Sequence, residues 1–123
     1  MILTDTSVWS DHLGTPEASL MMLLDEELVL GHPFVTGELA MARFKDREVV
    51  LLSLQDLRQA ERAEDDEVVR FVTQNKLAGL GLSYIDAHLL VSVLLTPGTM
   101  LWTRDKSLRN AAESLGIAAK HLR

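Results

Sequence analysis

Cysteine is absent from the 123-residue chain, and its absence excludes several kinds of chemistry. Without thiols the protein has no disulfide, no thiolate zinc site and no cysteine nucleophile. A metal must therefore be held by oxygen atoms or by the four histidines, and oxygen ligands favour magnesium or manganese. The histidines show no paired spacing typical of a zinc-binding helix. We expect capping, packing or surface roles for His12, His32, His88 and His121.

Long apolar runs are also missing. No uninterrupted stretch has membrane-spanning length, and the first residues lack the basic and apolar regions of a secretory signal. We therefore expect a cytoplasmic protein. Apolar residues make up 47% of the chain, which is enough for the packed core of one globular domain covering residues 1–123.

The chain lacks the basic excess expected of a passive nucleic-acid binder. It has 12 Lys and Arg residues against 18 Asp and Glu residues, for a formal charge of -6. The acids are concentrated at 61–67, which is typical of a solvated segment, whereas Arg104, Lys106 and Arg109 cluster near the C-terminus as candidate RNA contacts. A bound divalent ion would also reverse the local sign of charge at a carboxylate site.

Short apolar runs alternate with helical spacing, which predicts an α/β fold with a parallel sheet covered by helices. The expected strands are 2–4, 28–30 and 100–103, with a last edge strand at 116–118. The expected helices are 8–13, 17–26, 33–42, 46–63, 66–77, 83–95 and 105–115. Ligand sites of such open sheets lie beyond the carboxyl ends of the strands, where both Asp5 and Asp105 stand.

Three aspartates have a structural and a functional interpretation. Asp5 and Asp105 each follow a strand and precede a helix, so that a helix-capping role explains them almost as well as a ligand role. Asp86 follows Ser83 at the spacing of a capping box. The helix of Asp86 is apolar nearly all round, however, and a buried carboxylate must be paired, hydrogen-bonded or bound to metal.

Glu38 is a fourth candidate. The residues three and four positions away from it are all apolar: Phe34, Val35, Met41 and Ala42. We therefore expect Glu38 to point with the apolar face of its helix rather than into water. Two carboxylates so placed suggest a shared reason, because a divalent cation turns their mutual repulsion into ligation.

Four segments resemble, in chain order, the motifs of PIN-domain proteins and, more narrowly, of VapC-type toxins of toxin–antitoxin pairs: MILTDTSVWSDHL, HPFVTGELA, GLGLSYIDAHLL and LWTRDKSL. The resemblance runs across essentially the whole chain. It implies a three-layer α/β/α fold with a parallel sheet. It further implies a magnesium- or manganese-dependent endoribonuclease that is silenced by a cognate VapB-type antitoxin, and a homodimer.

By this resemblance, the catalytic and metal-binding residues carry over to Asp5, Glu38, Asp86 and Asp105. The hydroxyls of Ser7 and Thr103 fall where such proteins often place polar groups behind the ligands, although helix-start and strand-end hydroxyls explain them equally well. One or two cations would bind the scissile phosphate and lower the pKa of the attacking water, to give a 5′-phosphate and a 3′-hydroxyl. Either Glu38 or Asp86 could take the proton of that water.

Several alternatives remain open at this point. A nuclease of the same fold that cuts DNA is one, because no contact to a 2′-hydroxyl is visible in the sequence. A non-catalytic acidic α/β binding module, whose carboxylates are caps, is another. A phosphoacceptor domain is disfavoured because no convincing mid-chain strand ends in a phosphoacceptor. Trp9 and Trp102 could stack on a base, but their core spacing favours packing, and apolar residues at 50, 51, 52 and 54 could form a groove for an antitoxin helix.

Overall fold

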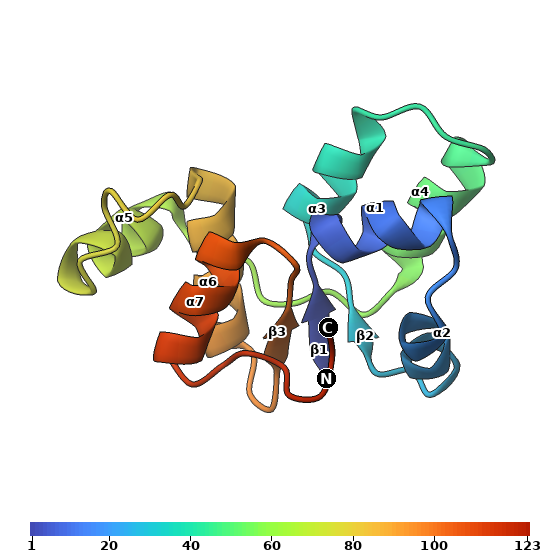
Figure 1. The fold of residues 1–123 in the computed structure, drawn as a ribbon. Helices are drawn as coiled ribbons and strands as arrows, with labels where there is room; N and C mark the ends of the chain where they lie inside the picture. Colours follow the sequence, from blue (N-terminus) through green and yellow to red (C-terminus); the bar gives the residue numbers. More distant parts are fainter.

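The computed structural model describes residues 1–123 and has three strands and seven helices (Figure 1). In chain order the elements are β1 (Ile2–Thr4), α1 (Thr6–Gly14), α2 (Ala18–Asp25), β2 (Val29–Leu30), α3 (Pro33–Ala40), α4 (Arg47–Asp56), α5 (Asp65–Gln74), α6 (Tyr84–Leu95), β3 (Met100–Trp102) and α7 (Lys106–Ser114). The expected α/β class with a short parallel sheet is confirmed. None of the helices is both long and apolar enough to span a bilayer.

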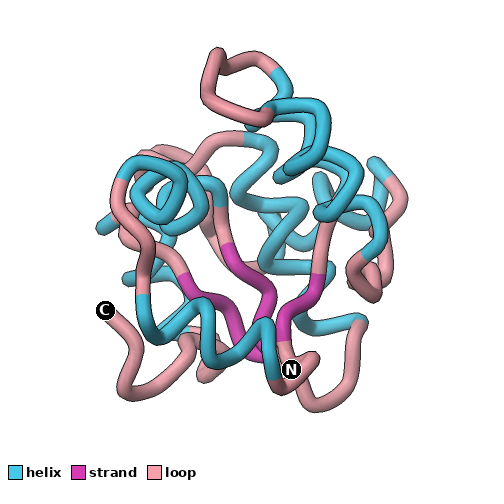
Figure 2. The backbone as a smooth tube through the Cα atoms, turned by 90° about the vertical axis from the view of Figure 1, so that its right-hand side faces the viewer, coloured by secondary structure: helices cyan, strands magenta, loops and turns pink.

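The sheet has the order β2-β1-β3, and both pairings are parallel. Ile2 pairs with Val29 on one side and with Met100 on the other, so the carboxyl ends of the three strands meet at one edge. The strands lie in the middle of the fold with helices around them (Figure 2). Leu3 and Leu101 are buried in the resulting core, as expected of a parallel sheet that helices cover on both faces.

Helix α6 is the most buried helix of the fold. Its residues from Ala87 to Val93 are all buried, which confirms the expectation that this helix is enclosed nearly all round. A helix placed in this way has little freedom to shift, since packing fixes it on several sides. Its first turn, which carries Asp86, is thereby held at a defined position next to the sheet.

The helix predicted over 46–63 is wrong in its second half, because α4 ends at Asp56. From Leu57 the backbone is extended, and it passes along the edge of β2. The N–H of Gly31 donates to the carbonyl of Arg58 at 2.8 Å, and the N–H of Ala60 donates to the carbonyl of Gly31 at 2.9 Å. Pairing with the end of a strand thus overrides local helical periodicity, which only reports which residues could share a face.

The last edge strand, expected at 116–118, is reduced to a single bridge between Leu101 and Ala118. The carbonyl of Ile117 accepts a hydrogen bond from the N–H of Leu101 at 2.7 Å, and the N–H of Ala119 donates to the carbonyl of Leu101 at 2.8 Å. The C-terminal segment therefore lies beside β3, as expected, but it is too short to count as a strand.

Candidate metal centre

The four predicted acidic residues come from different elements and lie around the carboxyl edge of the sheet, without touching one another. Asp5 directly follows β1, and its N–H donates to the carbonyl of Trp102 at the end of β3 at 2.9 Å. Asp105 stands just before α7, Asp86 lies in the first turn of α6, and Glu38 lies in α3. Tertiary folding therefore brings together side chains that are far apart in the sequence.

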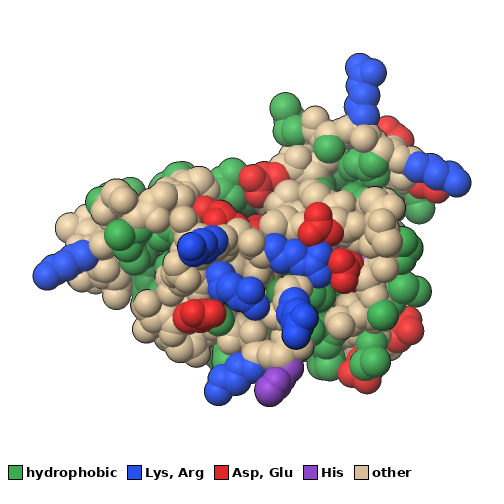
Figure 3. Space-filling view, viewed as in Figure 1, with side chains coloured by type: hydrophobic (Ala, Val, Ile, Leu, Met, Phe, Trp, Pro, Cys, Tyr) green, Lys and Arg blue, Asp and Glu red, His purple; other side chains and the backbone are tan.

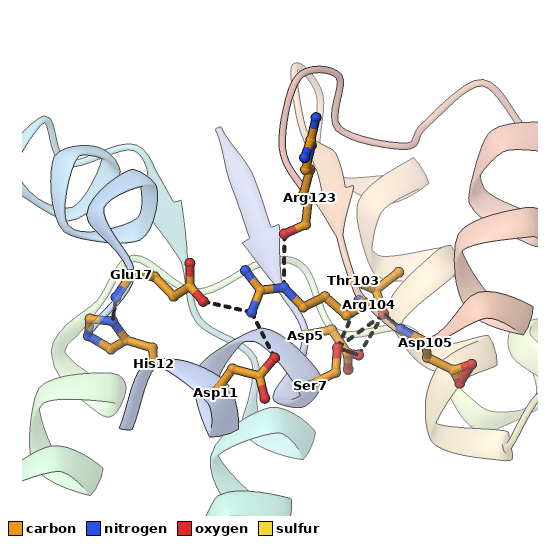
Figure 4. A network of polar contacts seen from close by, with 9 residues as sticks. All are labelled: Asp5, Ser7, Asp11, His12, Glu17, Thr103, Arg104, Asp105 and Arg123. Atoms are coloured by element: carbon orange, nitrogen blue, oxygen red, sulfur yellow. Dashed lines mark hydrogen bonds and ion pairs between the residues drawn. The ribbon is translucent and has the colours of Figure 1, made fainter. Parts of the chain in front are cut away.

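The carboxylate of Asp5 is buried and held by two hydroxyl groups (Figure 4). The hydroxyls of Ser7 and Thr103 both donate to its Oδ2 at 2.8 Å. Each hydroxyl also accepts from a backbone N–H, that of Arg104 for Ser7 at 2.9 Å and that of Asp105 for Thr103 at 3.1 Å. Because these N–H groups occupy the acceptor side of each hydroxyl, the hydroxyl protons are directed at Asp5.

This arrangement separates the two interpretations of Asp5. The residue occupies the N-cap position of α1, but its side chain makes no capping hydrogen bond. Its Oδ1 accepts no hydrogen bond from the chain, although the residue is only 6% exposed. Oδ1 is not among the buried polar atoms that lack a partner, so it reaches solvent and is open to a ligand, and the side chain does not act as a cap.

Asp105 and Asp86 both make the capping hydrogen bonds that the sequence suggested, each with one of its two carboxylate oxygens. Asp105 Oδ1 accepts from the N–H of Ser107 at 3.0 Å. Asp86 and Ser83 form a capping box, in which Asp86 Oδ2 accepts from the N–H of Ser83 at 3.0 Å. Each cap uses one carboxylate oxygen and leaves the other without a partner in the chain. Capping and metal binding are therefore compatible in both residues.

The charges of the three aspartates act on one another. Burial raises the pKa of the half-buried Asp86 carboxyl, and the negative charges of Asp5 and Asp105 raise it further, while hydrogen bonds from Ser83 oppose the increase. Asp86 is therefore close enough to both of the others to sense their charge. A cation placed among them would remove this electrostatic cost.

The expectation that Glu38 points with the apolar face of its helix is wrong. Val35 and Leu39 take the inward face of α3, and Glu38 is exposed at the rim. Met41, which suggested an apolar neighbourhood, lies beyond the helix end and is 88% exposed. Glu38 nevertheless faces the site, because its Oε1 accepts from the Thr6 hydroxyl at 2.7 Å.

Sequence reasoning missed the part that Thr6 plays. The run from Asp5 to Ser7 suggested only residues that can cap a helix, and it gave no sign that the middle hydroxyl reaches another helix. Only the placement of α3 beside the start of α1 reveals that Thr6, the residue next to Asp5, donates its hydroxyl hydrogen bond to Glu38. A run of three polar residues directly after a strand was the available signal.

The donor set fits a hard divalent cation in its chemistry. All four side chains are carboxylates, and each keeps one oxygen free of hydrogen bonds from the chain. Oxygen-only sites of this kind suit magnesium and manganese. In the positions that they occupy, no three acidic or imidazole side chains stand close enough to share one ion. To share one ion, the carboxylates would have to come closer together than they are in this structure.

Arg104, a candidate RNA contact, is engaged by the protein itself. Its Nη1 donates to Asp11 at 2.7 Å and to Glu17 at 2.8 Å, and its Nε donates to the carbonyl of Arg123 at 2.8 Å (Figure 4). The hydrogen bonds to Glu17 and Asp11 raise the pKa of Arg104. Arg104 thus ties β3 to α1 and to the C-terminal segment, and its charge is not available to a phosphate in this conformation.

The other two basic candidates differ. Arg109 donates to the carbonyl of Leu122 at 3.0 Å and lies 3.7 Å from the carboxylate of Glu113, whereas Lys106 is exposed and forms no ion pair. Basic side chains gather over the α7 side of the molecule, with acidic side chains among and above them (Figure 3). Of the three predicted contacts, Lys106 is the one whose charge is free.

The scattered histidines and the tryptophans have the structural roles that we expected. His32 caps α3 by accepting from a backbone N–H, and His12 accepts from the backbone N–H just before α2. His88 is fully buried beside α5. Trp9 and Trp102 belong to the core, where neither ring is free to stack on a base.

Comparison with known proteins agrees with the motifs. Ribonuclease VapC32 from two strains of Mycobacterium tuberculosis is 47% identical to the chain over 118 residues, which cover 96% of this chain and 95% of the relative. No family model and no solved structure matches the chain. Identity at this level over nearly the full length of both proteins shows common descent and a common fold. The chain belongs to the VapC family of PIN-domain proteins.

Proposed function

We propose that the protein is a divalent-metal-dependent endoribonuclease and the toxin of a toxin–antitoxin pair. The observation that carries the proposal is the buried Asp5 residue, whose carboxylate two hydroxyls orient at the sheet edge around which Glu38, Asp86 and Asp105 also lie. The name of the two relatives, Ribonuclease VapC32, supports RNA as the substrate. A capping role does not explain why two hydroxyls hold the Asp5 carboxylate, since its side chain makes no capping hydrogen bond.

In this proposal Asp5, Glu38, Asp86 and Asp105 hold one or two divalent cations, magnesium or manganese. The cation supplies positive charge for the scissile phosphate and lowers the pKa of the attacking water. Ser7 and Thr103 keep the Asp5 carboxylate in one orientation, so that binding the ion costs little conformational entropy. The buried side of the site restricts water, which strengthens each electrostatic contact there.

Two side chains remain candidates for the proton acceptor. Glu38 and Asp86 each have one oxygen without a donor from the chain, and both lie at the edge of the site rather than at its base. Either could accept the proton of the attacking water, and hydrolysis would leave a 5′-phosphate and a 3′-hydroxyl. Lys106, whose charge is free, is placed to contact a phosphate of the RNA.

The proposed partners are RNA, a VapB-type antitoxin and a second copy of the chain, in the cytoplasm. An apolar surface on α4 suits an antitoxin helix, because Val49 and Leu52 are 65% and 63% exposed and lie one helical turn apart. Beside it, Trp9, Leu13 and Leu24 line a shallow apolar hollow. Of the positions that the sequence suggested for this groove, only Leu52 is exposed; Val50, Leu51 and Leu54 pack in or against the core, and Val50 and Leu54 also line the hollow.

Cleavage of a mixed RNA pool and a matched DNA pool by the purified, antitoxin-free protein tests the proposal. We expect RNA to be cut with magnesium or manganese and not with a chelator, and the products to carry a 5′-phosphate. Asp5→Asn keeps the shape of the side chain and removes its charge, so it should abolish cleavage. Asp25→Asn, at the exposed end of α2, is the matched control and should leave the rate unchanged.

The outcomes separate the alternatives. Cutting of DNA alone would replace the ribonuclease by a DNA-directed nuclease of the same fold. Equal rates for Asp5→Asn and the unmodified protein would refute the carboxylate mechanism. A folded protein that cuts neither pool with any metal would favour the non-catalytic binding module.

A further inference from the structure

An aromatic cluster lies on α3 and α6, the helices that carry Glu38 and Asp86, and is distinct from the two buried tryptophans. The rings of Phe34 and His88 are 4.7 Å apart between centroids, and those of Tyr84 and His88 are 4.6 Å apart, both in edge-to-face geometry. His88 is fully buried, whereas Tyr84 is 48% exposed and Phe34 is partly exposed. The cluster therefore has a buried base and a surface that faces solvent.

The same two helices carry this cluster and two of the carboxylates. Phe34 and Glu38 are four residues apart in α3 and so lie on one face of that helix. Tyr84 and Asp86 both belong to the first turn of α6. The contact between the Phe34 and His88 rings joins these helices, so the aromatic surface and two of the carboxylates are carried by one pair of helices, with Tyr84 and Asp86 on different faces of α6.

Tyr84 is held in place, unlike most exposed aromatic side chains. Its hydroxyl donates to Asp65 Oδ1 at 2.9 Å, and His88 Nε2 lies 3.1 Å from the same oxygen. The ring is therefore ordered before any ligand arrives, which reduces the entropy lost on binding. The two neighbouring donors also offset the negative charge of Asp65.

A free cation accompanies the rings. The guanidinium carbon of Arg62 lies 4.9 Å from the centroid of Phe34, and Arg62 is exposed and forms no ion pair. An ordered ring beside a guanidinium, which offers both a plane and a positive charge, is a combination that binds unstacked nucleotides. An acidic protein needs such a local site to hold RNA near its carboxylates.

We propose that Tyr84, Phe34 and Arg62 form a subsite for one nucleotide of single-stranded RNA, with its base stacked on Tyr84 and its phosphate facing Arg62. The subsite rests on the proposed ribonuclease, and it places the strand so that a neighbouring phosphate reaches the carboxylates. Stacking tolerates any base, so this contact selects unpaired RNA rather than a sequence.

Fluorescence anisotropy with two labelled probes tests the subsite: an oligouridylate, and an abasic ribose-phosphate chain of equal length. Measurements are made with a chelator present, so that binding is read without cleavage. We expect Tyr84→Ala to weaken oligouridylate binding by about 10- to 100-fold and to leave binding of the abasic chain unchanged. Tyr84→Phe, which keeps the ring and loses the bond to Asp65, should retain most of the affinity.

Leu95→Ala removes an exposed side chain at the other end of α6 and is the matched control. Arg62→Gln should weaken both probes alike and reduce the salt dependence of binding. Equal loss of both probes in Tyr84→Ala, or equal affinity of the unmodified protein for the two probes, would overturn the subsite. If metal-dependent RNA cleavage is intact in that case, the proposed function stands without it. If the protein does not cleave RNA but Tyr84→Ala weakens only oligouridylate binding, the nucleotide subsite is supported and the proposed nuclease activity is not.

Discussion

Protonation of His32 should set the stability of the protein in mild acid. Its Nδ1 accepts from the N–H of Phe34 at 3.0 Å, so this nitrogen carries no proton, and its Nε2 donates to Ser92 at 2.9 Å. The side chain is fully buried. Burial, assisted by the charges of His88 and Arg62, lowers the pKa of His32 from 6.5 to about 4.

The lowered pKa of His32 makes the free energy of unfolding depend on pH. Between pH 6.5 and pH 4 the unfolded chain binds a proton at His32, whereas the folded protein does not. The free energy of unfolding therefore falls as the pH falls through this window, and the loss is complete below the folded pKa. The difference in pKa corresponds to about 3 kcal/mol, a large part of the stability of a small domain.

Comparison with His32→Asn isolates this contribution. Asparagine is a strong N-cap residue and can accept from the N–H of Phe34, but it does not titrate. We expect urea unfolding to show that the unmodified protein loses about 3 kcal/mol relative to the variant between about pH 7 and about pH 4. The lost bond to Ser92 adds an offset that does not vary with pH. A difference in stability that is constant across the window would refute the reasoning.

Three further changes have defined outcomes. Thr103→Val removes one of the hydroxyls that orient Asp5, so the rate of metal-dependent cleavage should fall by about 10- to 100-fold. Thr103→Ser keeps the hydroxyl and should restore the rate. A Thr103→Val rate equal to that of the unmodified protein would contradict the positioning role. Leu52→Glu should weaken antitoxin binding at least about tenfold in calorimetry and change the unfolding free energy by no more than about 0.5 kcal/mol; unchanged affinity would place the antitoxin elsewhere. Gly31→Ala should lower the unfolding free energy by about 1–3 kcal/mol, because a Cβ there would lie 3.0 Å from the Leu54 carbonyl oxygen. An unchanged midpoint of urea unfolding would contradict this, since it would show that the neighbouring backbone moves aside without cost.

Placement of the site was accessible from the sequence where it depended on strand ends. Asp5 and Asp105 follow β1 and β3, and parallel strands put their carboxyl ends at one edge, so their proximity could be predicted from periodicity alone. Asp86 was identified because a carboxylate in an apolar helix needs a partner, and the capping box supplies only one.

Other features depended on contacts that no local pattern contains. The exposed position of Glu38 depends on how α3 packs, because Val35 and Leu39 face the core and Met41 lies beyond the helix end. The engagement of Arg104 by Asp11 joins residues separated by 93 positions, so its charge looked free in the sequence. The early end of α4 likewise results from pairing with the edge of β2.

Binding of Mn²⁺ to the purified protein, followed by calorimetry, tests the central claim most directly, because it asks whether the four carboxylates share an ion. We expect saturable binding that is lost or strongly weakened in Asp5→Asn, Glu38→Gln, Asp86→Asn and Asp105→Asn, and that is unchanged in Asp25→Asn. Binding that survives in all four variants with the affinity of the unmodified protein would contradict the claim.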